Sequence, residues 1–195
     1  MNRRGRRGLA PIAPVAAASA ALALIAGATP ALAVEREHHL GADLGGGLLV
    51  IDDKSTNDLG GSAGVHYSYG LSDEFNLMAE ASWSLLALHQ DADSKKTPHD
   101  YPSWMGNADV GIGYVFDVLQ WVPYAGVLVG GYAMDGGTLS NLRVLVGAEV
   151  ALGLDYRVSP TFSIGVAARQ HFVTQTSTYP SFTQGFFRAE YVWGW

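Results

Sequence analysis

Residues 185–195 read GFFRAEYVWGW, in which apolar side chains at every second position alternate with Arg188 and Glu190. A period of two residues is the signature of a β-strand whose two faces differ. One face of this strand is aromatic and the other is charged. The fold depends on whether each face meets water, lipid or other side chains. The rest of the chain decides between these possibilities.

The composition restricts the class of protein. The chain has 195 residues, of which 48% are apolar and only 15% are charged, well below the roughly 25% of ordinary soluble domains. It has 24 glycines and no cysteine. Disulfides, thiol catalysis and cysteine metal sites are therefore excluded.

The first 33 residues predict a secretory signal peptide. Arginines at 3, 4, 6 and 7 precede an Ala/Leu-rich run and then Ala31-Leu32-Ala33, an A-x-A cleavage site. An N-terminal membrane anchor is the alternative, but the prolines leave an apolar run shorter than the roughly 20 residues that a span needs. We expect one domain, 34–195. With four of the 12 basic residues removed, 8 remain against 18 acidic ones, a net charge of −10 that disfavours nucleic acid as a partner.

Eight strands are predicted after the signal peptide. Runs of about ten residues alternate with turn-forming stretches, and no run has a capped helical repeat. The expected strands lie near 39–51, 62–71, 75–88, 105–116, 122–134, 143–157, 161–172 and 184–195.

Each run separates into an apolar and a polar phase. The apolar phase carries no charge, and in the run 122–134 we assign Val122, Tyr124, Leu128 and Tyr132 to it. The polar phase is made of small residues and of the following charged or histidine side chains: Asp43, His66, Glu80, Asp109, Arg143, Glu149, Asp155, Arg157, Arg169, His171, Arg188 and Glu190.

Two architectures fit this alternation, a soluble lipocalin-like barrel with its apolar face inside and a membrane barrel with that face toward lipid. Opposed carboxylates and guanidiniums without lysine suit a narrow lumen better than a water-facing surface. Short connectors at 71–74, 117–121 and 158–160 alternate with long polar ones, as in outer-membrane barrels. Aromatic residues also collect at the tight-turn rim, as in a membrane-interface girdle: Tyr67, Tyr69, Tyr114, Phe116, Tyr124, Tyr156 and Phe162. These features favour a closed, antiparallel eight-stranded transmembrane β-barrel in meander order.

The stretches LGADLGGGLLV, YSYGLSDEFNLMAEASW, YVFDVLQWVPYAGVLVGGY and LGLDYRVSPTFSIGVAARQHF resemble the OmpA/OmpX-like outer-membrane β-barrel superfamily. The resemblance implies a location in the outer membrane, contact with its lipid and lipopolysaccharide, and a monomer. The ending is similar to the C-terminal signal that the barrel assembly machinery reads in such proteins, with Tyr191, Trp193 and Trp195 at alternate positions. Most members end in Phe, so Trp195 is a departure.

The candidate functional residues are the lumen charges Glu80, Glu149, Arg169, Arg188 and Glu190. We interpret them as a static plug of charge-assisted pairs, with an ion-selective gate as the alternative. A lipid A deacylase would show His-x-Ser, whereas His171 is followed by Phe172 and Val173. The sequence thus predicts a non-enzymatic structural or surface-interaction role, with small-solute leakage a lesser alternative.

No cofactor or metal is expected. The connector HQDADSKKTPHD holds side chains that could ligate a divalent ion, but their spacing matches no established site, and a solvated loop explains them. The partner of the loops is unknown at this point.

Overall fold

The computed structural model describes residues 36–51, 56–91, 100–116, 120–174, 178–179 and 181–194, with the backbone alone described at 56–57 and 89–91. The predicted signal peptide and Trp195 lie outside the described residues. Among the residues that are described, no helix has both the length and the apolar character needed to cross a membrane.

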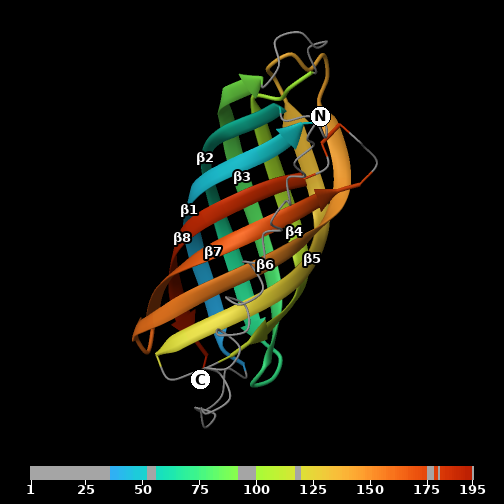
Figure 1. Cartoon of the computed structure of the whole chain (residues 1–195). Coiled ribbons are helices and arrows are strands. Elements are labelled where there is room, and N and C mark those ends of the chain that lie inside the picture. The colour runs from blue at the N-terminus through green and yellow to red at the C-terminus, as the bar shows by residue number, and fades with distance from the viewer. Residues whose placement is uncertain are drawn as a thin grey trace, which may run out of the picture. The chain divides into compact units, whose positions relative to one another are not determined.

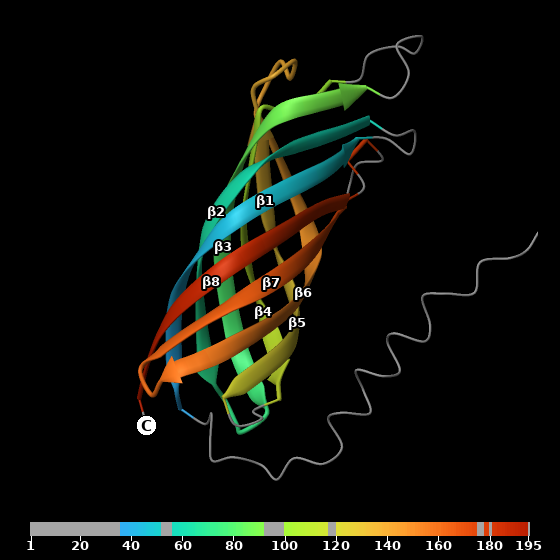
Figure 2. The ribbon, with the colours of Figure 1, turned by 60° about the vertical axis from the view of Figure 1, so that its left-hand side comes forward.

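All the regular structure is β. The strands are β1 (His38–Ile51), β2 (Thr56–Gly70), β3 (Phe75–Asp91), β4 (Trp104–Val115), β5 (Trp121–Asp135), β6 (Arg143–Ser159), β7 (Phe162–Val173) and β8 (Ser181–Trp193). Each strand pairs antiparallel with the next along the chain, and β1 pairs with β8 to close the barrel. Figures 1 and 2 show the tilted strands and the β1–β8 seam. The predicted eight-stranded closed meander is confirmed.

The two ends of the barrel differ. At the tight-turn end, Leu71 donates its backbone N–H to the carbonyl of Phe75 at 2.8 Å, and the Ser72 hydroxyl accepts the N–H of Phe75 at 3.1 Å. At the other end, which we call the loop end, the β5–β6 loop begins with Gly136 and Gly137 at φ of 76° and 61°. Only glycine adopts such angles without strain, so this loop can turn sharply over the barrel mouth.

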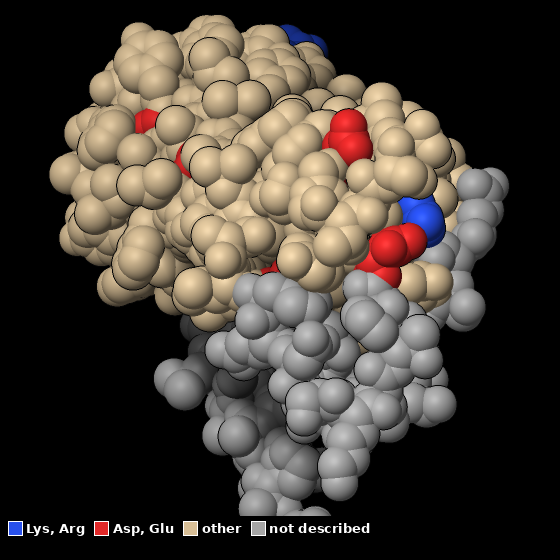
Figure 3. All heavy atoms as spheres, turned by 90° about the horizontal axis from the view of Figure 1, so that it is seen from above, with Lys and Arg blue, Asp and Glu red and all other residues tan. Residues whose placement is uncertain are grey.

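The apolar phase faces outward in seven strands. Leu44 in β1 and Phe187 in β8 are 71% and 76% exposed, whereas their neighbours Asp43 and Arg188 are buried. Seen from the loop end, the visible described surface has few charged side chains (Figure 3). An outer wall of exposed Leu, Val and Phe needs lipid around it, which disfavours a soluble ligand-binding barrel.

The phase predicted for β5 is wrong. Val122, Tyr124, Leu128 and Tyr132 face the lumen, and Tyr124 is only 7% exposed. The outward residues of β5 are instead the alternate set, including Val127, which is 62% exposed. The strand is apolar on both faces because the lumen beside it is itself lined by apolar side chains.

Candidate functional site

The lumen contains all five predicted charged residues. Glu80 comes from β3, Glu149 from β6, Arg169 from β7, and Arg188 and Glu190 from β8, and all five are buried. The Arg169 Nε atom lies 2.5 Å from Glu80 Oε2 and 3.8 Å from Glu149 Oε1. Arg188 Nη2 lies 2.5 Å from Glu190 Oε1. The five therefore form two groups, one around each guanidinium.

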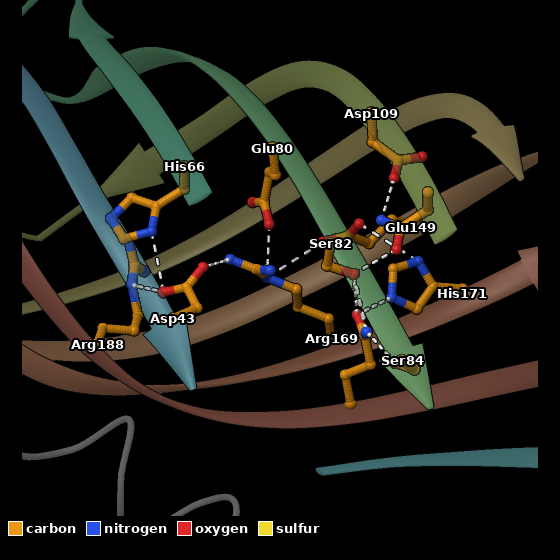
Figure 4. A network of polar contacts seen from close by, with 12 residues as sticks. Asp43, His66, Glu80, Ser82, Ser84, Asp109, Glu149, Arg169, His171 and Arg188 are labelled. Carbon is orange, nitrogen blue, oxygen red and sulfur yellow. Dashed lines mark hydrogen bonds and ion pairs between the residues drawn. The ribbon is translucent and has the colours of Figure 1, made fainter. Parts of the chain in front are cut away.

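Asp43 of β1 joins the two groups, a role that the sequence did not reveal. Its Oδ2 accepts a hydrogen bond from Arg169 Nη2 at 2.6 Å, and its Oδ1 lies 3.5 Å from Arg188 Nε. Figure 4 shows Asp43 between these side chains and His66. Its parity placed Asp43 on the polar face, but contacts across the barrel depend on strand tilt, which parity does not give.

Histidines extend the network toward the tight-turn end. The His66 ring lies between two carboxylates, with Nδ1 2.9 Å from Asp43 and Nε2 2.7 Å from Glu190. His39 lies 3.4 Å from both Glu190 and Glu37. Both rings therefore lie within contact distance of the Glu190 carboxylate.

Gly41 makes room for this arrangement. A Cβ at Gly41 would lie 2.3 Å from the His66 ring and 2.7 Å from the carbonyl oxygen of Ala189. Because the backbone oxygen cannot yield as a side chain does, any larger residue would push the ring away from its carboxylates.

Glu37 closes the tight-turn end just before β1. Its carboxylate pairs with Arg157 and lies 3.4 Å from His39. Burial raises the pKa of Glu37, but hydrogen bonds from His39 and Arg157 outweigh burial and hold that pKa below its ordinary value of 4.5.

A ladder of amides and hydroxyls lies on the loop-end side of the charged groups. Gln184 Nε2 donates to the Ser82 and Ser84 hydroxyls at 2.8 and 3.1 Å, and its Oε1 lies 2.9 Å from His171 Nε2. Asn107 Nδ2 donates to Asp109 Oδ2 at 2.6 Å. Neutral side chains thus fix the orientation of the His171 ring and of the Asp109 carboxylate.

An apolar cluster fills the lumen at the loop end. We call this set the loop-end cluster: Leu49, Ile51, Leu86, Met105, Tyr132, Met134, Leu139, Val173, Tyr179 and Phe182. The loops pack onto it, since Thr138 and Tyr101 exchange two hydrogen bonds and the Tyr179 hydroxyl donates to the Asp100 carbonyl at 2.9 Å. This part of the lumen is therefore largely apolar.

A cavity of about 30 Å³ lies at the tight-turn end of the lumen, bounded by His39, Tyr124, Asp155 and Arg188. Above it, the Arg188 guanidinium stacks 4.7 Å over the Tyr124 ring.

The predicted aromatic girdle lies on the outer face except for Tyr124, whose ring is inside the barrel. Its parity was misassigned because β5 carries no charge before its last residue, Asp135, to mark its polar side. The outward members contact further rings: Tyr67 and Tyr69 with His38, Tyr114 with Phe75 and Phe116, and Tyr156 with Trp121. Phe162 is 41% exposed.

Two other predicted features are only partly described. Tyr191 and Trp193 of the C-terminal signal stack on the outer face with ring centroids 5.7 Å apart. The candidate ion ligands of the loop that follows β3 have no described side chain except Asp100, so that site lies outside the described residues.

An eight-stranded barrel with an apolar exterior and a filled, charged interior defines the class of small outer-membrane β-barrels. Residues 19–189 match the model of the outer membrane protein beta-barrel domain family, and the chain belongs to that family and to the outer membrane. Comparison with curated proteins by sequence gave no significant match.

Solved structures show the same fold. Neisserial surface protein A is similar with a TM-score of 0.59 and 15% identity over 81% of this chain and 97% of that one. The N-terminal β-barrel domain of Pseudomonas aeruginosa OprF gives 0.57 and 10%, over 82% and 98%. Ail, the attachment invasion locus protein of Yersinia pestis, gives 0.53 and 13%, over 82% and 100%.

Proposed function

We propose that this protein is a non-conducting, non-enzymatic outer-membrane barrel that presents an ordered surface at its loop end. The observation that carries the proposal is the double closure of the lumen. Ion pairs around Arg169 and Arg188 fill its middle, and the loop-end cluster fills its mouth. A solute would have to displace both.

The surface role rests on the packing of the loops. Leu139 of the β5–β6 loop is buried in the loop-end cluster, and the Arg143 guanidinium lies 5.6 Å over the Tyr179 ring. Loops anchored to a common apolar cluster present a fixed surface and lose little entropy when they bind a partner.

The positions of His66 and His171 support a non-enzymatic role. Chemistry on a membrane lipid needs reactive groups that the lipid can reach. His66 and His171 point inward and are 3% and 0% exposed. Their polar contacts are with lumen groups such as Asp43, Glu149 and Gln184.

The remaining partners in this proposal follow from the outer wall. Lipid and lipopolysaccharide contact the exposed leucine, valine and phenylalanine side chains, and the barrel assembly machinery reads the C-terminal aromatics Tyr191, Trp193 and Trp195. The barrel works as a monomer.

Conductance in planar lipid bilayers tests the closure. The wild-type barrel should give no steady current, with a known porin as the positive control. Arg169→Ala should stay closed because the loop-end cluster remains, whereas Arg169→Ala combined with Phe182→Ala should conduct. Steady wild-type current that rises in Arg169→Ala or Arg188→Ala would instead establish a leakage channel.

Surface presentation is tested separately in whole cells. A short epitope inserted after Ser140, in the β5–β6 loop, should bind antibody without permeabilisation. The matched control is the same insertion after Asp73, in the tight turn between β2 and β3, which should bind only after permeabilisation. The reverse pattern would contradict the proposed orientation.

A further inference from the structure

We infer that Asp109, Glu149 and His171 form a binding site for one divalent first-row metal cation in the lumen. The three side chains come from β4, β6 and β7 and meet beneath the loop-end cluster (Figure 4). This inference goes beyond the proposed function, because a closed barrel needs no metal in order to present its loops.

The geometry suits a small cation. One ligand atom from each residue lies within 4.8 Å of the other two, and His171 Nδ1 is 3.3 Å from Glu149 Oε2. Metal–ligand distances of about 2.0–2.2 Å place ligand atoms roughly 3.3 Å apart. Closing the remaining gap takes side-chain shifts of about 1 Å, with the strands in place.

The hydrogen bonds of His171 make Nδ1 the acceptor nitrogen of the ring, and it faces the Tyr132 hydroxyl at 3.1 Å. Gln184 Nε2 donates to Ser82 and Ser84, so its Oε1 faces His171 Nε2 at 2.9 Å and can only accept. The neutral ring then carries its proton on Nε2. A carbonyl partner on the second ring nitrogen is the usual support for a metal-ligating histidine.

Three of the four carboxylate oxygens of Asp109 and Glu149 lack a donor among the described residues, while Asp109 Oδ2 accepts from Asn107 Nδ2 at 2.6 Å. Neither oxygen of Glu149, nor Oδ1 of Asp109, accepts a hydrogen bond from the described residues. Both side chains are more than nine-tenths buried. The Tyr132 hydroxyl, 3.1 Å from His171 Nδ1, brings a single proton to this group of acceptors. Several acceptors converging with so few donors are the pattern of a cation site.

The charges point the same way. Arg169 is shared by Asp43 and Glu80 at 2.6 and 2.5 Å, and reaches Glu149 only at 3.8 Å. Within the described chain, Asp109 has no ion-pair partner, and it lies directly opposite Glu80 in the β3–β4 register. Like charges opposite each other on neighbouring strands repel. A bound cation of charge +2 would balance the two negative charges of Asp109 and Glu149.

The ligand types narrow the metal. Two carboxylates and one imidazole suit Zn²⁺, Mn²⁺ or Fe²⁺ better than Ca²⁺, which prefers oxygen ligands alone. Zn²⁺ and Co²⁺ serve as probes, the second because its visible absorption reports the ligands directly. The competing arrangement is a proton shared between the carboxylates and the ring.

The test refolds the untagged mature chain in detergent with Zn²⁺, removes loosely bound ion by desalting, and measures metal by atomic spectroscopy. We expect about one Zn²⁺ per chain, and a loss of affinity of at least about tenfold in Glu149→Gln and in Asp109→Asn. Asp155→Asn, which removes a buried lumen carboxylate at the tight-turn end, should bind as the wild type does.

Each variant is first shown to be folded by its heat-dependent gel shift and strand-rich circular dichroism. The wild type refolded with Co²⁺ gives a readout that needs no variant, namely absorption bands of imidazole and carboxylate coordination. The inference is overturned if the folded wild type retains neither metal, or if Glu149→Gln and Asp155→Asn bind equally. The first result would assign the balancing charge to protons, and the second would locate the ion elsewhere.

Discussion

The charged and apolar halves of the same lumen are closed by opposite means. In the middle of the barrel, carboxylates surround Arg169 and Arg188, and near the loops, methionine, leucine and phenylalanine side chains pack as in a soluble core. Both sets lie on the inward face of the same strands. The inward side chains of a small barrel must therefore fill its interior, and either charged pairs or apolar side chains can do so.

The two halves depend on each other. The loop-end cluster keeps water away from the charges below it, which strengthens their attraction and also raises the free energy of any charge left unpaired. An ion pair and a leucine in this lumen consequently differ in what their removal leaves behind. Removing a leucine leaves a void, whereas removing a guanidinium leaves buried anions.

The largest effect is expected for Arg169→Ala. The variant leaves Asp43 and Glu80 buried without their guanidinium, which should lower the free energy of unfolding by about 3–5 kcal/mol. Equilibrium unfolding in urea, in detergent micelles or vesicles, measures the change. The control is Arg143→Ala at the exposed loop end, expected to change stability by less than about 1 kcal/mol. Equal effects of the two variants would show that the lumen charges are hydrated.

The next effect is expected for Leu49→Ala in the loop-end cluster. Leu49 is fully buried, and its truncation should cost about 2–5 kcal/mol by leaving a cavity. Leu44→Ala on the same strand points outward, where lipid fills the space, and should cost about 1 kcal/mol at most. The comparison fails if Leu44→Ala is the more damaging, since the cluster would then be loosely packed.

The sequence predicts the charged half of the lumen better than the apolar half. In seven strands the charged side chains that the structure describes lie on one face only, so parity assigns the inside, and it placed Asp43, Glu149 and Arg169 correctly. β5 has no charge between Trp121 and Asp135. There the larger rings were taken as outward, although Tyr124 and Tyr132 belong to the lumen.

Contacts across the barrel follow from strand tilt and stagger, which a linear sequence does not contain. The register puts His66 directly opposite Glu80, but His66 contacts Asp43 and Glu190 instead. The neutral partners were missed for another reason. Gln184 and Ser84 carry no charge, and they gain their role only from the group that each one faces.

A smaller effect is expected for Arg188→Lys, which keeps the charge and removes the planar fork. Arg188 reaches Asp43, Asp155 and Glu190 from different nitrogens and stacks on Tyr124, and a single ammonium cannot do the same. The free energy of unfolding should fall by about 1–2 kcal/mol, less than in Arg169→Ala. A loss as large as that of Arg169→Ala would mean that geometry matters more than charge in this half.

The smallest effect is expected for Glu37→Gln at the tight-turn end, and it depends on pH. Because the pKa of Glu37 is lower in the folded barrel, its contribution to stability is fully present above the ordinary value of 4.5 and disappears as the pH falls through the folded pKa. The variant should be less stable than the wild type by about 1 kcal/mol or less at neutral pH, and the difference should vanish once the pH falls below the folded pKa of Glu37. Urea midpoints measured across this range give the result. A stability difference that persists in acid would show that Glu37 acts through packing. The stabilising charge pairs of the lumen would then extend toward the tight turns only as far as His39 and Glu190.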